Sequence, residues 1–248
     1  MKTVLITGCS SGFGLDTAKH FLEQGWKVVA TMRTPRRDLL PASDNLLVLP
    51  LDVTNDESVR NAVDLAGPID VLVNNAGIGW LNALEGTSID TTRSIFETNT
   101  FGTMRMIDAV LPQFRERQAG LIINVTSSVT MKPLPLLSVY TASKAAVNAF
   151  TESLALELAP FGIAVKIVLP GAAPDTSFGT TALSRLRENG GFPAAYAEFA
   201  DGVIAGMRAS GAPRTQSSDV AEAVWRAAND ESLPIRIPAG ADAVALAD

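Results

Sequence analysis

The sequence predicts a doubly wound α/β fold, in which helices cover both faces of a parallel sheet. Apolar runs of strand length alternate along the chain with longer stretches of helical periodicity, and this alternation requires crossover helices between parallel strands. The runs Val-Leu-Ile at 4–6, Val-Leu-Val at 71–73 and Leu-Ile-Ile at 121–123 are continuously apolar, which is typical of strands buried on both faces. A glycine-rich turn separates the first strand from the first helix.

The elements of the first half follow from local signals. Val4–Thr7 is a strand run, Thr7–Gly14 is the glycine-rich turn, and Leu15–Glu23 has helical periodicity, which predicts a first helix at about 13–24. Further apolar runs and one helical pattern then follow in the order Lys27–Met32, Leu46–Leu51, a helix at about 55–66, and Val71–Asn74.

The second half continues the same rhythm. Helical patterns and strand runs alternate at about 88–117, Leu121–Val125, about 138–160, Ile163–Leu169, about 217–229 and Pro234–Ile237. Residues 172–214 do not keep this rhythm. We expect them to form an insertion over the ends of the strands.

Length and charge restrict the class of protein. A chain of 248 residues with 47% hydrophobic content can bury a large core, and no Pro/Gly/Ser-rich linker divides it, so we expect one domain over residues 1–248. Lys and Arg number 20 against 26 Asp and Glu, which gives a net charge of −6. The longest basic run is Arg36-Arg37, so the charge pattern argues against nucleic acid as a partner.

Cysteine and histidine are too scarce for several kinds of site. The single Cys cannot form an internal disulfide, and the single His, His20, cannot supply a metal cluster or a Ser-His-Asp triad. We therefore expect no metal. No apolar segment approaches ~18 residues and no cleavage-site pattern follows the start of the chain, which favours a soluble, cytoplasmic protein without membrane contact.

Tyr140 and Lys144 are four residues apart, and the stretch Ala145–Phe150 after them has helical character. Both side chains should therefore lie on one face of a helix. A free phenol titrates near ~10, but a nearby cation stabilises the phenolate and lowers that pKa. Such a pair can exchange a proton with an alcohol, although the same spacing also fits two side chains that snorkel over apolar surface.

The strand, glycine turn and helix at the amino terminus favour a phosphate-binding site. Gly8 and Gly12 permit backbone geometry that other residues avoid, and Gly14 allows a close approach of helix and strand. The N-terminus of the helix offers free N–H groups to a pyrophosphate. The spacing is Gly-x-x-x-Gly-x-Gly, not the commoner Gly-x-Gly-x-x-Gly.

These residues resemble the short-chain dehydrogenase/reductase family, in the branch with Thr-Gly-x-x-x-Gly-x-Gly and Tyr-x-x-x-Lys. The resemblance continues through Asn74–Gly77 at the end of the fourth strand, Asn99–Gly102 as Asn-x-x-Gly, Ser127 before Tyr140, and Pro170–Gly171 after a later strand. It covers about residues 3–171 and implies a Rossmann-like fold that binds a nicotinamide dinucleotide.

The resemblance implies a role for each of four residues. Tyr140 gives its proton to a carbonyl oxygen as hydride arrives from the nicotinamide and takes it back in oxidation, and Ser127 hydrogen-bonds the same oxygen. Lys144 holds the ribose and lowers the pKa of Tyr140, and Asn99 fixes a water that connects Lys144 to solvent. Because the carboxyl ends of the strands meet at one edge of an open sheet, the motifs that follow them should converge there.

A larger set of residues along these motifs is expected to contact the cofactor. The set is Gly8, Ser10, Ser11, Gly12, Phe13, Gly14, Arg33, Asp52, Val53, Asn75, Ala76, Gly77, Tyr140, Lys144, Pro170, Gly171 and Thr176. Asp52 fits either the family acid beside the adenine ring or a helix or turn cap. Asn74 and Asn75 fit either a cofactor contact or a tight turn. The family Thr after Pro-Gly is displaced, because Asp175 takes its place and Thr176 follows.

The end of the second strand predicts NADP(H) rather than NAD(H). An Asp or Glu there usually bonds the ribose 2′-OH of NAD, whereas an Arg accommodates the 2′-phosphate. This chain has Met32 where the acid would stand and Arg33 next to it.

We therefore predict an NADP(H)-dependent oxidoreductase that interconverts a carbonyl, favoured as a hydrophobic ketone, and an alcohol. One alternative is a catalytically silent dinucleotide-binding sensor, and another is epimerase or dehydratase chemistry on sugar nucleotides. The expected substrate wall is apolar, although Trp80 and the leucines fit plain core equally well. Its members are Ile78, Trp80, Val129, Leu134, Leu136, Phe178, Leu183 and Phe192.

Two further expectations concern the insertion and assembly. Residues about 174–212 should act as a lid that sets substrate choice, with Gly179, Gly190–Gly191 and Gly202 as hinges, or else form an ordered surface excursion. The resemblance implies a homo-oligomer, dimer or tetramer. The helices at about 88–117 and 138–160 are the expected contact, because they carry more small and apolar positions than one core-facing stripe needs.

Overall fold

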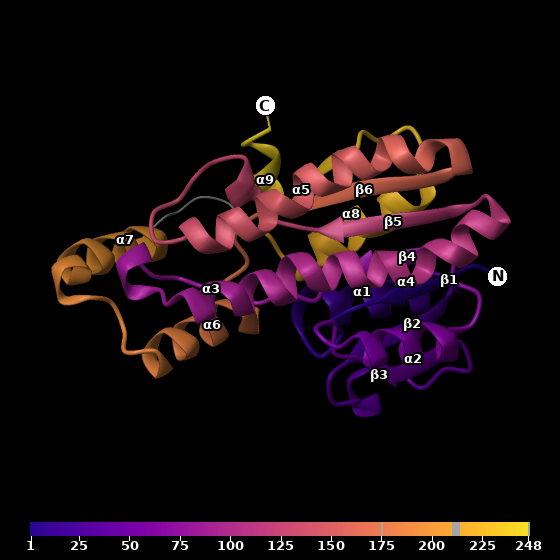
Figure 1. Ribbon diagram of the computed structural model, residues 1–248, viewed down its shortest axis with the longest axis horizontal. Helices are drawn as coiled ribbons and strands as arrows, with labels where there is room; N and C mark the ends of the chain where they lie inside the picture. Colours follow the sequence, from indigo (N-terminus) through magenta and orange to yellow (C-terminus); the bar gives the residue numbers. More distant parts are fainter. Residues whose placement is uncertain (175, 210–213, 248) are drawn as a thin grey trace.

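The centre of the protein is a parallel sheet (Figure 1), in a computed structural model that describes residues 1–174, 176–209 and 214–247. Among the residues that the structure describes, seven strands lie in the order β3-β2-β1-β4-β5-β6-β7. They are β1 Thr3–Ile6, β2 Lys27–Met32, β3 Leu46–Pro50, β4 Val71–Asn74, β5 Gly120–Val125, β6 Ile163–Pro170 and β7 Arg236–Ala239. The order reverses between β1 and β4, which is where open α/β sheets bind ligands, and the predicted doubly wound fold is confirmed.

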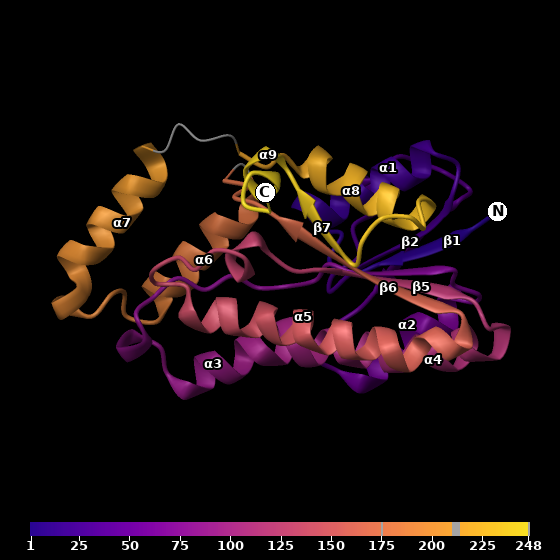
Figure 2. The same cartoon turned by 90° about the horizontal axis from the view of Figure 1, so that it is seen from above.

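Helices cover both faces of the sheet (Figure 2). On one face α1 (Gly12–Glu23) packs beside α8 (Ser217–Asn229). The other face carries α2 (Asp56–Ala66), α4 (Gly102–Arg117) and α5 (Ser138–Leu158). The molecule therefore has three layers: helices, the sheet, and helices again. Because the strands are parallel, their carboxyl ends all lie at one edge of the sheet.

Two hydrophobic cores fill the space between these layers. Val4 and Ile6 of β1 pack in the core under α1 and α8, whereas Leu5 packs in the core under α2, α4 and α5. All three side chains are fully buried. Because successive strand residues point to opposite faces, a strand that is covered on both faces needs apolar residues at every position, which explains the continuous runs in the sequence.

The helix predicted over 88–117 is interrupted. It consists of α3 (Ile89–Phe96), a π-turn at Glu97–Phe101, and α4. Such wider turns occur frequently at functional sites. The cause of this one is tertiary, because Asn99 Nδ2 donates to Ser143 Oγ and Thr100 Oγ1 donates to the Ser143 carbonyl on α5.

The last strand lies two residues beyond its predicted position at Pro234–Ile237. Its pairing with β6 continues as far as Pro170 opposite Ala239. The apolar signal ends at Ile237, but backbone pairing with β6 does not depend on the side chains that follow. The last strand therefore continues to Ala239, at the edge of the sheet where β6 also ends.

In its described residues the expected insertion contains two α-helices, α6 (Ser177–Glu188) and α7 (Ala197–Ala209), which extend beyond the ends of the strands (Figures 1 and 2). Of the expected lid at 174–212, residues 175 and 210–212 lie outside the described part of the chain. Gly190 and Gly191 have positive φ and form an anchored turn, because Asn82 Nδ2 donates to the Gly191 carbonyl at 3.2 Å. Among the described residues, no helix has the length and apolar content that crossing a bilayer requires.

Candidate active site

The glycine-rich turn after β1 lies against the turn after β4, too close for a side chain at two positions. A Cβ at Gly8 would come within 2.9 Å of the Ala76 Cα, and φ at Gly8 is +75°. A Cβ at Gly14 would come within 2.4 Å of both the Gly8 carbonyl oxygen and Asn75 Nδ2. Close backbone approach therefore requires glycine at both positions.

Thr7 and Asn75 hold these two turns together. Thr7 Oγ1 accepts hydrogen bonds from the N–H groups of Asn75 at 3.0 Å and Ala76 at 2.9 Å. Asn75 Nδ2 donates to the Thr7 carbonyl at 2.9 Å. The Asn75 amide thus supports the tight turn, which was one of its two expected roles.

The helix α1 begins at Gly12 with its N-terminus open. In the described part of the chain no side chain caps it, because the Ser11 hydroxyl lies 2.8 Å from the Ser177 hydroxyl of α6 instead. Ser10 is exposed beside it, and Phe13 packs partly buried against the core under α1. The backbone N–H groups of the first turn therefore remain for an anionic ligand.

The π-turn directs Asn99 toward the turn after β4. Asn99 Oδ1 accepts from the Ile78 N–H at 2.8 Å, and Nδ2 donates to the Ile78 carbonyl and to Ser143 Oγ, both at 3.0 Å. A Cβ at Gly77 would lie 3.3 Å from Asn99 Oδ1 and 3.4 Å from Lys144 Nζ. Both side chains therefore converge on Gly77.

Tyr140 and Ser127 are buried together at the end of β5. Their exposed fractions are 7% and 8%. Burial raises the pKa of Tyr140 to about 12, and a hydrogen bond with Ser127 opposes this rise. The resemblance implied the opposite direction for this pKa. The difference arises because loss of water disfavours the charged phenolate.

Lys144 is equally buried, on the next turn of α5. Its ammonium group donates to the Val125 carbonyl at 3.0 Å. Burial lowers the pKa of Lys144 to about 8, since leaving water disfavours the charged form. The expected lowering of the Tyr140 pKa by Lys144 is not found, because burial of the phenol is the largest cause of its shift.

Asp52 caps the turn after β3. Its Oδ1 accepts from the Thr54 N–H at 2.9 Å and from Thr54 Oγ1 at 2.7 Å, and these bonds hold the pKa of Asp52 below its usual value. The exposed Arg33 at the end of β2 contributes a smaller lowering of the same pKa. Val53 is buried against Gly102, where a Cβ would lie 2.7 Å from Val53 Cγ2. Of the two interpretations of Asp52, the turn cap is present.

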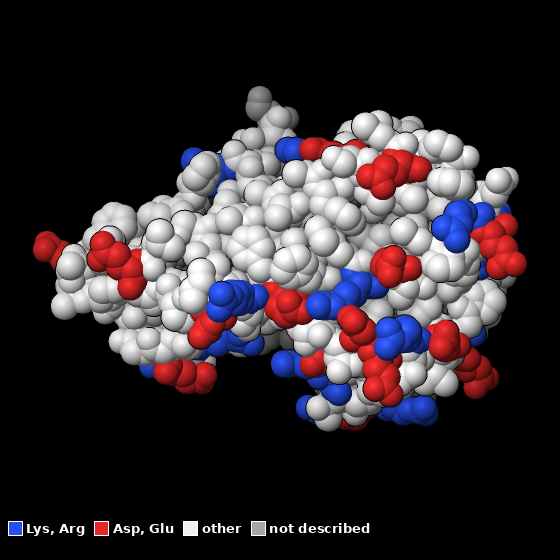
Figure 3. All heavy atoms as spheres, in the orientation of Figure 1, with Lys and Arg blue, Asp and Glu red and all other residues white. Residues whose placement is uncertain are grey.

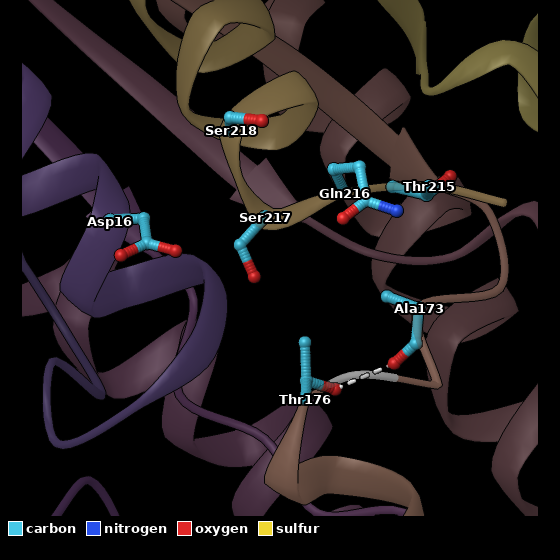
Figure 4. Close-up of a pocket in the computed structure, with 7 residues that line it drawn as sticks. All are labelled: Asp16, Ala173, Thr176, Thr215, Gln216, Ser217 and Ser218. Carbon is cyan, nitrogen blue, oxygen red and sulfur yellow. Dashed lines mark hydrogen bonds between the residues drawn. The ribbon is translucent and has the colours of Figure 1, made fainter.

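The turn after β6, which begins at Gly171 directly after Pro170, reaches the glycine loop through Thr176. Thr176 Oγ1 donates to the Ala173 carbonyl at 2.8 Å, and a Cβ at Gly12 would lie 3.5 Å from the Thr176 Cβ. A cavity of about 240 Å³ opens here between α1 and the start of α8 (Figure 4). Asp175, which displaces the family Thr, lies outside the described residues.

One aromatic ring of α6 lies on the site. The Phe178 ring centroid is 5.7 Å from that of Tyr140, with the rings tilted by 59°. A Cβ at Gly79 would lie 2.7 Å from the same ring. Three members of the expected apolar wall are buried in two small clusters: Trp80 and Val129 pack in one together with Tyr140, and Leu136 packs in the other.

The structure also shows residues that the motifs did not indicate. Ser143 is fully buried, donates to the Tyr140 carbonyl at 2.7 Å and accepts from Asn99. Its position three residues after Tyr140 on one helix was a usable signal. Thr215 and Asp242 hold the turn after β6, and no sequence pattern pointed to them.

The four residues expected to share a site therefore do so. Ser127 lies close enough to Tyr140 to lower its pKa, Asn99 is linked through Ser143 to the Tyr140 backbone carbonyl, and Lys144 meets Asn99 at Gly77. The described residues hold no group of three His, Cys, Asp or Glu that could bind a metal. A phenol, a hydroxyl and an amine in one buried site can move a proton to or from a ligand oxygen.

Sequence comparison finds a matching family model and several related proteins. The family model described as short chain dehydrogenase matches residues 2–185. An uncharacterized oxidoreductase of Bacillus subtilis, YusZ, is 35% identical over 96% of this chain and 89% of its own. Human retinol dehydrogenase 8 is 41% identical over 68% of this chain, and the match spans 58% of its length.

Solved structures agree in fold. A short-chain dehydrogenase from Streptomyces avermitilis has a TM-score of 0.82 and 33% identity, covering 99% of this chain and 91% of its own. A serine dehydrogenase with NADP⁺ bound has a TM-score of 0.77 and 30% identity, covering 96% and 94%. A 3-ketoacyl-(acyl-carrier-protein) reductase from Brucella melitensis with NADH bound has 0.78 and 30%, covering 96% of each. The serine dehydrogenase thus holds the phosphorylated dinucleotide NADP⁺, and the ketoacyl reductase holds the unphosphorylated NADH.

The lowered pKa of Lys144 predicts a pH-dependent cost in stability. Well below pH 8 the lysine is protonated in both the folded and the unfolded chain, so the full cost of burying the charge, about 3 kcal/mol, is present. As the pH rises from about 8 toward 10.5, the folded state loses the proton first and the cost disappears.

The free energy of unfolding of the wild type should therefore rise relative to that of Lys144→Met across this pH range. Urea denaturation at several pH values measures the difference. Lys132→Met, at an exposed lysine, is the matched control for loss of a charge. A difference between wild type and Lys144→Met that stays constant with pH would contradict the lowered pKa.

Proposed function

This chain belongs to the short-chain dehydrogenase family, and from that premise we propose that it is an NADP(H)-dependent oxidoreductase that interconverts a hydrophobic ketone and an alcohol. The observation that carries the proposal is the shared burial of Ser127, Tyr140 and Lys144, with Lys144 at Gly77 in the turn that packs against the glycine loop. We propose that residues 1–248 act as one nucleotide-binding unit, with 174–212 as its substrate-binding part.

The residues of the glycine loop fit a dinucleotide. Gly8 and Gly14 leave a cradle that a Cβ would close, and the first turn of α1 lacks a side-chain cap in the described part of the chain. Both features suit a pyrophosphate, which needs close backbone approach and free N–H groups. We propose that Gly12, Ser11 and Thr176 complete this contact.

When bound, the nicotinamide supplies or accepts the hydride, and the chain itself handles the proton. Tyr140, whose pKa is raised to about 12, keeps its proton at neutral pH and can donate it to the carbonyl oxygen during reduction. Ser127 hydrogen-bonds the same oxygen and orients it. Lys144, whose pKa is near 8, can return a proton to Tyr140 after the step.

Tyr140→Phe should remove nearly all turnover, because a general acid contributes about 10²–10⁴ in rate. The affinity for NADPH should stay within a few-fold, since the ring and its packing remain. Steady-state kinetics and fluorescence titration measure the two effects. Tyr196→Phe, at the other tyrosine of the chain, is the control and should keep its activity.

A tenth or more of the wild-type rate in Tyr140→Phe would exclude Tyr140 as the acid. A silent dinucleotide-binding sensor, the alternative from another functional class, predicts a different pattern. It would bind NADPH in the wild type without turning over any carbonyl compound.

The preference for NADP(H) rests on the end of β2. Met32 is buried and Arg33 beside it is exposed, close enough to Asp52 to lower that pKa. An arginine at this place can bind the 2′-phosphate, whereas no acid is present at Met32 or Arg33 to bond a free 2′-OH.

Arg33→Ala should therefore raise the KM for NADPH by about ten-fold, the size of one lost charge-assisted bond, and leave the KM for NADH nearly unchanged. Arg37→Ala, an exposed arginine four residues further on, is the matched control. The proposal is wrong if wild-type enzyme has the higher kcat/KM with NADH, or if Arg33→Ala leaves the NADPH value unchanged.

Substrate choice is proposed to depend on α6. Phe178 touches the Tyr140 ring and is 41% exposed, so it forms an apolar wall that a substrate would meet at the proton donor. Apolar walls favour ketones with hydrophobic substituents over sugars. We propose that α6 shifts when cofactor and substrate bind, and that this movement gives the segment its role as a lid.

Phe178→Ala should raise kcat/KM for bulky ketones relative to small ones by several-fold, because space opens beside Tyr140. A panel of aryl, alicyclic and steroid-like ketones with NADPH oxidation as the readout measures the ratio. Phe199→Ala makes the same change at a 54% exposed position on α7 and should leave the ratio unaltered. Equal ratios in both variants would remove Phe178 from the wall.

Assembly into a homo-oligomer is proposed through α4 and α5. Figure 3 shows that charged side chains run along α4 and gather below it, whereas few lie over α5. Leu156 on α5 is 80% exposed and Phe101 before α4 is 47% exposed. An apolar face of this kind favours a partner surface.

Light scattering of the wild type should give a multiple of 26.1 kDa at micromolar concentration. Leu156→Glu should lower the measured mass, because it places a charge in the proposed contact. Leu65→Glu, at a 63% exposed leucine of α2, is the control. A wild-type mass of 26.1 kDa would refute the oligomer.

A further inference from the structure

A carboxylate near the end of the chain holds the turn that follows β6. Asp242 lies in α9 (Ala241–Val244), well beyond the stretch that carries the family motifs. Its Oδ2 accepts from the Ala172 N–H at 2.7 Å, and its Oδ1 accepts from the Thr215 hydroxyl at 2.6 Å. Hydrogen bonds of this length to a charged acceptor belong to the stronger class.

Thr215 is also hydrogen-bonded to this turn. It is 1% exposed, and its Oγ1 accepts from the Gly171 N–H at 3.0 Å. Its own N–H donates to the Ala172 carbonyl at 3.0 Å. The N–H groups of Gly171 and Ala172 and the Ala172 carbonyl are therefore all bonded to segments near the end of the chain.

Two glycines make room for this arrangement. A Cβ at Gly171 would lie 2.2 Å from Asp242 Oδ1, so only glycine lets the carboxylate reach the turn. A Cβ at Gly240 would lie 2.0 Å from Thr215 Oγ1, and φ at Gly240 is +94°. The carboxylate is thus fitted closely against the backbone of the turn.

The turn leads directly to the glycine loop. Ala173 follows Ala172, its carbonyl accepts from both the N–H and the hydroxyl of Thr176, and Thr176 lies beside Gly12. A shift of the turn would therefore move Thr176 relative to the loop that is proposed to bind phosphate.

We propose that Asp242 is a positioning residue for the cofactor, which acts by fixing Gly171, Ala172 and Thr176 against the glycine loop. The inference rests on the proposed function, since it takes these residues as part of the cofactor site. It assigns to the end of the chain a role in cofactor affinity and none in the proton transfer.

Asp242→Asn in the full chain tests this role. The amide retains one acceptor oxygen for two donors, so one charge-assisted bond is lost, and the Kd and KM for NADPH should rise by about ten-fold. At saturating NADPH, kcat and the KM for the ketone should stay within two-fold, a split that general loss of structure would not give. Asp44→Asn, at an exposed loop aspartate, controls for the change in charge.

Fluorescence titration separates the possible results. Wild type that binds neither NADPH nor NADH would refute the proposed function itself. Wild type that binds, together with a folded Asp242→Asn of equal affinity, would overturn only the inference about Asp242. If Asp242→Asn does not fold, Thr215→Val and Thr215→Ser decide: weaker NADPH binding in the first and recovery in the second support the inference, and equal affinities overturn it.

Discussion

The close approach of two backbone turns, the glycine loop after β1 and the turn after β4, is the constraint on which the rest of the site depends. Thr7 and Asn75 fix the distance between them, and Gly8 and Gly14 make it possible. The same turn after β4 continues to Gly77, where Asn99 and Lys144 meet. A shift of the glycine loop would therefore be passed through the turn after β4 to Asn99 and Lys144.

Burial sets the electrostatic character of this site. Burial removes water from both side chains, which raises the pKa of Tyr140 and lowers the pKa of Lys144. Both shifts favour the neutral form of the side chain. Next to this site, Asn124 of β5 donates to the Thr151 hydroxyl of α5, which in turn donates to the Val147 carbonyl. These buried hydrogen bonds tie β5 to α5. Such bonds fix the helix in one position, because an unpaired polar group there would be costly.

The sequence was most informative where one local signal dictates one local structure. The paired apolar strands and the glycine loop are of this kind, because burial on both faces and close backbone approach leave few other residues possible. The π-turn at 97–101 was not predictable, since it depends on Ser143 of another helix. Asp242 was equally hidden, because its partners Ala172 and Thr215 are distant in sequence and aspartate at a helix start has many ordinary uses.

The π-turn has a consequence for how the chain can vary. Such a turn holds one residue more than the α-helical ladder around it, so it has the form of a single-residue insertion that a helix has absorbed. Removing one residue there would let α3 and α4 join as one regular helix, and Asn99 would rotate away from Ile78 and Gly77. Helical regularity and the placement of Asn99 are therefore in direct conflict, so a change of length in this segment that made the helix more regular would also move Asn99 off its partners.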